Sequence, residues 1–244
     1  MAALRMLWLG LLGLYEETAV LVGANLGWIA VNLPLYVVLA AIAIPFAGFL
    51  PTSGPEWVLA LLAWVLLFLP SPASVALAAV ASVAAGPDVP RLRLFWTTLR
   101  SQWRIALVSF VISLVVTVAL FANVYFYALF TSGLLRFATI LWLYGALFWF
   151  SLHIYLVPLL VHVAEPKLFD VYRRAALIAL GHPLFTLVVL IEITILGTLC
   201  LVFIPAYVLI GPAYLSMIQA HAFREIRRRH GDLVEEVVEE NIRL

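Results

Sequence analysis

Residues 64–104, WVLLFLPSPASVALAAVASVAAGPDVPRLRLFWTTLRSQWR, decide the fold of this chain. The part up to Gly86 is apolar enough to cross a bilayer and has no charged residue. The part after Gly86 mixes aromatic and aliphatic residues with four arginines, Arg91, Arg93, Arg100 and Arg104. Such a mixture is typical of a helix in the membrane interface, with apolar groups in lipid and guanidinium groups in water. The segment therefore predicts which side of the membrane carries the basic loops.

The composition is that of an integral membrane protein. Apolar residues make up 66% of the 244 residues and charged residues 11%, and the mean hydropathy is +1.13. A soluble domain has about 45–50% apolar and roughly 25% charged residues. The single cysteine, Cys200, lies in an apolar run, which excludes a disulfide framework.

Six membrane spans are predicted in an all-α fold. A hydrocarbon core of ~30 Å requires about 20 helical residues, and the apolar runs place the spans at about 20–46, 57–85, 105–130, 135–163, 181–201 and 204–223. Prolines inside these runs predict kinked helices, because each removes a backbone donor. We expect one polytopic domain over residues 1–230, followed by an amphipathic cytoplasmic tail over 231–244.

The distribution of Lys and Arg predicts the topology. With six spans, Arg136 is the only Lys or Arg on one side of the membrane, and all others fall on the opposite side. The positive-inside rule assigns that opposite side to the cytoplasm. Both chain ends are therefore predicted to be cytoplasmic.

Two amphipathic elbow helices are predicted to lie in the plane of the membrane, one before the third span and one before the fifth. Each follows a proline and combines a Leu-Phe pair with arginines. Their basic residues are predicted to contact anionic lipid, at ~1 kcal/mol each, and not nucleic acid. These are Arg91, Arg93, Arg100 and Arg104 in the first elbow and Arg173 and Arg174 in the second.

Four stretches resemble the YesL-like family of bacterial integral membrane proteins: NLGWIAVNLP (25–34), WVLLFLPSPASVAL (64–77), RLFWTTLRSQWRIAL (93–107) and VYRRAALIALGHPLFTL (171–187). The chain departs from the family at Ser71-Pro72-Ala73-Ser74, where members usually carry T-x-G-P. The resemblance implies a multi-pass protein of the bacterial inner membrane with an accessory role in carbohydrate uptake by ABC-type importers. It implies no catalytic residue and no cofactor.

Glu192 is the main candidate for a functional residue. A carboxylate near the middle of a span costs ~2.5–3.5 kcal/mol on insertion scales, so such groups normally face a cavity or a partner. Polar residues of other spans are candidate partners: His153, Asn123, Asn32 and Asn25. Glu192 could act in proton-linked transport or substrate binding, or it could tie two helices together by hydrogen bonds.

The motifs of common membrane enzymes are missing from the sequence, which lacks H-E-x-x-H, G-x-S-x-G and a P-loop. We therefore predict a protein that is not an enzyme and binds no metal. The leading hypothesis is a scaffold that contacts membrane lipids and ABC transporter subunits or a second copy of itself. The alternative is a small solute transporter or channel with Glu192 in its pathway.

Overall fold

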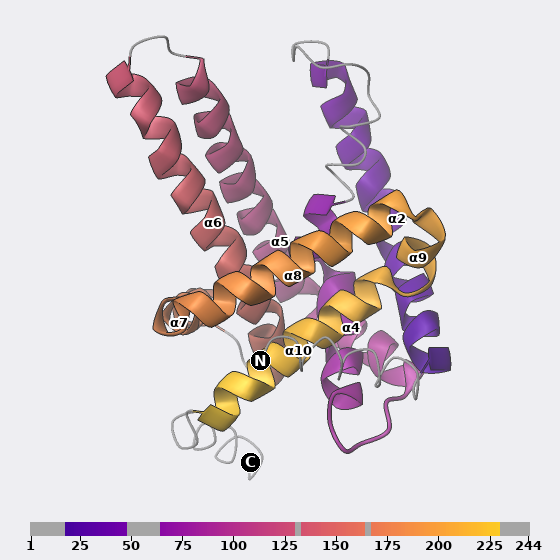
Figure 1. Cartoon of the computed structure of the whole chain (residues 1–244). Helices are drawn as coiled ribbons and strands as arrows, with labels where there is room; N and C mark the ends of the chain where they lie inside the picture. Colours follow the sequence, from indigo (N-terminus) through magenta and orange to yellow (C-terminus); the bar gives the residue numbers. More distant parts are fainter. Residues whose placement is uncertain (1–17, 48–63, 130–132, 164–166, 230–244) are drawn as a thin grey trace.

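The computed structural model describes residues 18–47, 64–129, 133–163 and 167–229, and within them the chain is helical, without strands. The helices are α2 (Thr18–Ala47), α4 (Pro72–Ala84), α5 (Leu92–Ala128), α6 (Gly133–His162), α7 (Leu168–Gly181), α8 (Pro183–Val202), α9 (Ile204–Leu209) and α10 (Gly211–Arg229) (Figure 1). The predicted tail over 231–244 lies outside the described residues.

Four of the described helices are long and apolar enough to cross a membrane: α2, α5, α6 and α8. This finding supports a multi-pass membrane protein. The predicted spans over 57–85 and 204–223 have no counterpart among these four. In the described part of the former, the helix ends at residue 68 and α4 begins at Pro72. The latter is divided between α9 and α10, and α10 ends in three consecutive arginines.

The short helix α4 lies at the centre of the fold and packs against α2, α5, α6 and α10. Its residues from Ala73 to Ala81 are all buried. Ser71 caps its first turn, because the Ser71 hydroxyl accepts a hydrogen bond from the Ser74 N–H at 3.0 Å. Small side chains allow the four neighbouring helices to approach α4 closely, so this apolar run forms an interior helix.

The expectation of a separate elbow helix over residues 91–104 is wrong. These residues form the first turns of α5, which is continuous for 37 residues. The physical reason is that no glycine or proline interrupts the sequence between Leu92 and Ala128. The second predicted elbow is a separate helix, α7, since His182 and Pro183 follow its last residue, Gly181.

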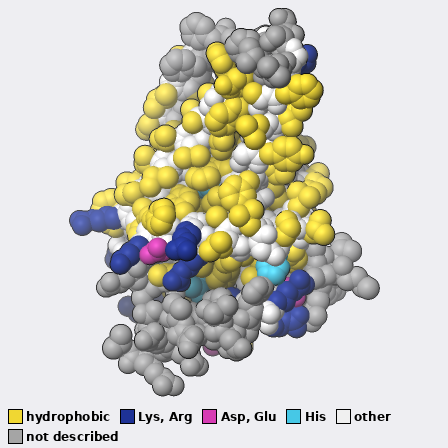
Figure 2. All heavy atoms as spheres, turned by 90° about the vertical axis from the view of Figure 1, so that its left-hand side faces the viewer, with side chains coloured by type: hydrophobic (Ala, Val, Ile, Leu, Met, Phe, Trp, Pro, Cys, Tyr) yellow, Lys and Arg dark blue, Asp and Glu magenta, His cyan; other side chains and the backbone are white. Residues whose placement is uncertain are grey.

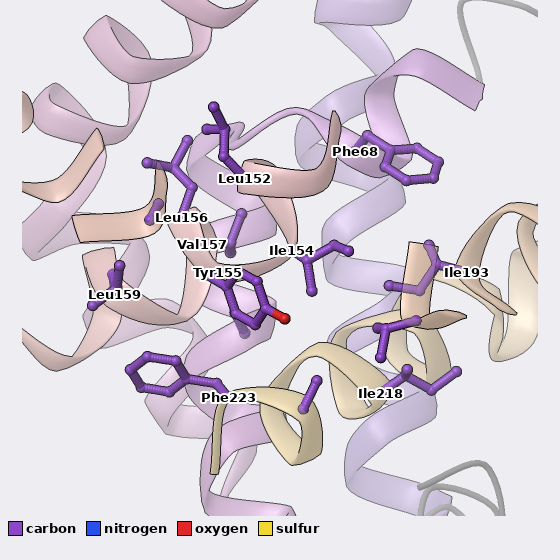
Figure 3. Close-up of a cluster of buried hydrophobic side chains, with 14 of the residues drawn as sticks. Phe68, Leu152, Ile154, Tyr155, Leu156, Val157, Leu159, Ile193, Ile218 and Phe223 are labelled. Carbon is purple, nitrogen blue, oxygen red and sulfur yellow. The ribbon is translucent and has the colours of Figure 1, made fainter. Parts of the chain in front are cut away.

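Helices α8, α9 and α10 form a hairpin that crosses the lower part of the molecule obliquely, whereas α2, α5 and α6 extend to its upper end (Figure 1). Side chains from α6, α7, α8 and α10 form one buried apolar cluster, which includes Tyr155, Ile193 and Phe223 (Figure 3). A second cluster joins α2, α4, α5 and α10 around Trp28 and Leu77. The described part of the face in Figure 2 is largely apolar, and most of its basic side chains lie in the lower half.

Candidate functional site

Glu192 lies in the middle of α8 and is partly buried. Its Oε2 atom is buried and has no hydrogen-bond partner among the described residues. The carboxyl interacts electrostatically with Tyr214 of α10, across the hairpin. In the described part of the chain, no hydrogen bond or ion pair links Glu192 to any of its four predicted partners. The predicted polar site is therefore not assembled around Glu192.

His153 belongs to a different group of polar side chains, which joins α5, α6 and α7. His153 is fully buried, and its Nε2 lies 2.9 Å from the Ser113 hydroxyl on α5. The Ser113 hydroxyl lies 2.7 Å from the Tyr172 hydroxyl on α7. Tyr172 also donates to the Ser109 carbonyl oxygen at 3.1 Å, and its ring stacks on Trp149 at 5.9 Å between centroids. We call these five residues the His153 network.

The direction of the hydrogen bonds in the His153 network follows from its acceptors. His153 Nδ1 lies 2.7 Å from the Trp149 carbonyl oxygen, which can only accept, so Nδ1 carries the proton. The unprotonated Nε2 of the neutral ring then accepts from Ser113, and the single Tyr172 proton is shared between two acceptors, the Ser113 oxygen at 2.7 Å and the Ser109 carbonyl oxygen at 3.1 Å. Burial raises the pKa of Tyr172 despite its bonds to Ser109 and Ser113, which keeps the phenol protonated as this arrangement requires. The network thus has one consistent set of donors and acceptors.

Asn25 joins α2 to the junction between α9 and α10. Its Nδ2 donates to the carbonyl oxygens of Tyr207 and Val208 in α9, at 3.3 and 2.7 Å. Its Oδ1 accepts from the Ala213 N–H in the first turn of α10, at 2.9 Å. One fully buried amide therefore satisfies backbone groups on both sides of the α9–α10 junction. We call these contacts the Asn25 latch.

The other two asparagines have separate environments. Asn32 is buried on the same face of α2 as Asn25, and its Nδ2 has no hydrogen-bond partner among the described residues. Asn123 donates to the Ala119 carbonyl oxygen of its own helix at 2.8 Å. Trp28, between Asn25 and Asn32, donates to the Ser74 hydroxyl of α4 at 3.0 Å. Trp28 and Asn25 thus connect α2 to the first turn of α4 and to the first turn of α10, respectively.

All six basic residues assigned to the membrane interface have exposed side chains: Arg91, Arg93, Arg100, Arg104, Arg173 and Arg174. Exposed aromatic residues accompany those of α5, and the Trp103 ring lies 5.4 Å from the Arg104 guanidinium carbon. Arg224 has a different role, because its guanidinium donates to the Ala85 carbonyl oxygen at the end of α4. A cation at this position also interacts favourably with the dipole of α4.

A surface cavity of about 460 Å³ lies at the α5–α6 connection, lined by Ala128, Gly133, Arg136, Phe137, Thr139 and Ile140. Of the polar residues discussed above, Arg136 belongs to this lining, whereas Glu192, His153 and the asparagines do not. Among the described residues, no group of three or more His, Cys, Asp or Glu side chains could hold a metal ion. No family model, curated protein or solved structure matches this chain.

The sequence pattern did not identify Ser113, Tyr172, Trp149 or Arg224 as parts of polar networks. Ser109 and Ser113 are four residues apart, a spacing that places two hydroxyls on one helix face. Tyr172 lies next to Arg173 and Arg174, which drew the interpretation toward the lipid interface. Two features of the sequence could have indicated this network: a pair of serines four residues apart in one span, and a tyrosine in a short amphipathic helix.

Proposed function

We propose that this chain is a non-enzymatic membrane scaffold that acts as an accessory component of a carbohydrate importer of the ABC type. The observation that carries the proposal is how the interior polar groups are used. Asn25 bonds the backbone of α9 and α10, and His153 bonds Ser113 across two helices. These groups hold helices together, as polar residues between membrane helices commonly do. The link to carbohydrate import comes from the resemblance to the YesL-like family.

The basic side of the molecule is the surface on which such a scaffold would contact lipid headgroups and a partner. The exposed arginines of α5 and α7 lie here, together with the last turn of α10. Glu225 neutralises part of this charge, with Arg228 and Arg229 at 3.0 and 2.9 Å. The arginines of α5 and α7 have no acidic partner among the described ion pairs. They are available for anionic lipid or for acidic side chains of a transporter subunit.

Affinity purification in native lipid tests the scaffold proposal. We expect the tagged chain to recover subunits of an ABC-type importer. Replacing Arg100, Arg104, Arg173 and Arg174 by Gln should reduce that recovery by about tenfold or more, if each charge contributes on the order of 0.3–1 kcal/mol to docking. The control is Arg136→Gln, which removes one charge from the predicted opposite side. Recovery of no transporter subunit with the unmodified chain contradicts the proposal.

A second candidate function is solute transport through a pathway that includes Glu192. The observation that favours it is the buried Glu192 Oε2 without a hydrogen-bond partner among the described residues. An uncompensated carboxyl in a membrane helix is costly, and such groups mark ion and substrate pathways. Proton-linked solute uptake in liposomes should then be lost in Glu192→Gln and retained in Asn123→Ala. Equal uptake by the two variants and the unmodified chain contradicts a role in transport.

A further inference from the structure

The depth of the α8–α9–α10 hairpin can be located from its contact with α2. The Asn25 latch joins the α9–α10 junction to the second turn of α2, and the Tyr207 ring packs edge-on against Trp28 at 6.2 Å between centroids. Asn25 is seven residues after Thr18, the first residue of α2. At 1.5 Å per residue, this distance along the helix axis is only about 10 Å.

A second contact shows that this part of α2 is close to the basic side. Gly23 of α2 lies against the Leu92 side chain at the start of α5. A Cβ atom on Gly23 would be 3.4 Å from that side chain. Leu92 is flanked in sequence by the exposed Arg91 and Arg93. Asn25 is only two residues beyond Gly23, which is about 3 Å along α2. Helix α2 then continues for 22 residues past Asn25, about 33 Å, toward the opposite end.

The surface of the hairpin tip is apolar. Val202, Phe203 and Ile204 are 80%, 63% and 67% exposed, and Leu209 is 48% exposed. No charged residue occurs between Glu192 and Arg224. A connection at a water-exposed membrane surface would normally carry polar residues, whereas contiguous exposed apolar groups indicate contact with lipid or another apolar partner. The tip is continuous with the exposed apolar side of α8, which includes Ile195 and Leu199.

We propose that α8, α9 and α10 form a re-entrant hairpin that enters from the basic side, turns within the bilayer and returns to the same side. The tip residues Val202, Phe203 and Ile204 contact lipid acyl chains. Non-helical backbone at such a depth is tolerated only where its polar groups are satisfied by protein. The Asn25 latch supplies three of these hydrogen bonds at the α9–α10 junction. The inference concerns topology and does not depend on the proposed function.

Cysteine labelling with a membrane-impermeant maleimide tests this proposal. Because Cys200 is the only cysteine, Cys200→Ser provides a background for Ile204→Cys and for Val202→Cys. Two exposed positions mark the two sides in the same background: Val89→Cys, close to Arg91, and Leu129→Cys, at the far end of α5. Each variant is labelled in sealed vesicles of both orientations, after a monodisperse profile has confirmed that it is folded.

We expect the two tip cysteines to react at least about tenfold less than Leu129→Cys from the Leu129 side, because the reactive thiolate is disfavoured in lipid. Labelling from neither side agrees with a re-entrant hairpin whose tip lies among the acyl chains. Labelling from the Val89 side as fast as that of Val89→Cys contradicts the contact with acyl chains. Labelling of either tip cysteine from the Leu129 side overturns the proposal. If Cys200→Ser does not fold, the native Cys200 replaces the tip cysteines, with Leu129→Cys and Val89→Cys added to the unmodified chain, and the same outcomes apply.

Discussion

The two polar networks of this membrane protein solve different structural problems. The Asn25 latch satisfies backbone groups at a break between helices, where the hydrogen-bond pattern of the helix is interrupted. The His153 network joins helices α5 and α6, which are continuous at this level, mainly through side chains. A backbone carbonyl or N–H cannot be removed by mutation, whereas a side-chain donor and its acceptor can be removed together. Loss of the latch should therefore cost more than loss of the His153 network.

Asn25→Leu should produce the largest loss of stability of the variants considered. The substitution leaves the carbonyl oxygens of Tyr207 and Val208 and the Ala213 N–H without their partner, inside the protein. Each unsatisfied buried group costs about 1–3 kcal/mol, so we expect a loss of roughly 3 kcal/mol or more in the free energy of unfolding. Thermal unfolding in detergent micelles measures it.

Asn123→Leu is the matched control for Asn25→Leu. It removes the same amide from another membrane helix, where the amide bonds only to the carbonyl oxygen four residues earlier. That carbonyl oxygen keeps its helical N–H partner, so we expect a change within about 0.5 kcal/mol. If the two variants are destabilised equally, the latch contributes nothing that an ordinary asparagine in a membrane helix does not.

Substitutions in the His153 network should cause a moderate loss in the free energy of unfolding. His153→Ala leaves the Ser113 hydroxyl without its acceptor and opens a space in the interior, at about 2 kcal/mol. The pair Ser113→Ala and Tyr172→Phe removes a donor and its acceptor together. In a double-mutant cycle we expect a coupling energy of about 0.6–1.7 kcal/mol, the range found between membrane helices. A coupling energy of zero would mean that the 2.7 Å contact between the two hydroxyls does not contribute to stability.

The sequence predicted the continuous parts of this fold better than its breaks. Helices α2, α5, α6 and α8 follow from the length of their apolar runs, since length and hydropathy are local properties. The absence of glycine and proline after Leu92 also predicts a continuous α5, but the arginines of that stretch led to the expectation of a separate elbow. Whether two helices with a short connection cross the membrane or turn inside it depends on contacts such as Asn25–Val208. Asn25 and Val208 are 183 residues apart in the sequence, so no local sequence pattern predicts their contact.

The candidate site was predictable by residue type and not by pairing. Glu192, His153 and Asn25 were identified because polar residues in apolar runs are rare. The structure separates them into three environments: the face between α8 and α10, the His153 network and the latch. The partners of His153 and Asn25 are serine, tyrosine and backbone groups. These occur throughout membrane helices, so their types give no signal of a pairing.

Among the substitutions that disturb a contact between helices, Gly86→Ala should have the smallest effect. It tests whether a helix end at the edge of the protein is as sensitive to substitution as the buried latch. A Cβ atom on Gly86 would lie 2.9 Å from Arg224 Nη2 and 3.1 Å from the Val83 carbonyl oxygen. The guanidinium must therefore move away from the end of α4. Because Arg224 is a long side chain that can move into water, we expect a loss of only about 1 kcal/mol.

Two controls separate the loss of the Arg224 contact from a general effect of replacing glycine. A Cβ atom on Gly181 meets no heavy atom within 4 Å, so Gly181→Ala should leave stability unchanged or raise it by up to about 1 kcal/mol through helix propensity. In the Arg224→Ala background, Gly86→Ala should cost less than in the unmodified chain, since the displaced group is no longer present. Thermal unfolding of the four variants in micelles measures these differences. If Gly86→Ala costs the same with and without the Arg224 guanidinium, the effect comes from the Val83 carbonyl oxygen alone. The Arg224 contact would then not be comparable with the Asn25 latch as a stabilising bond to a helix end.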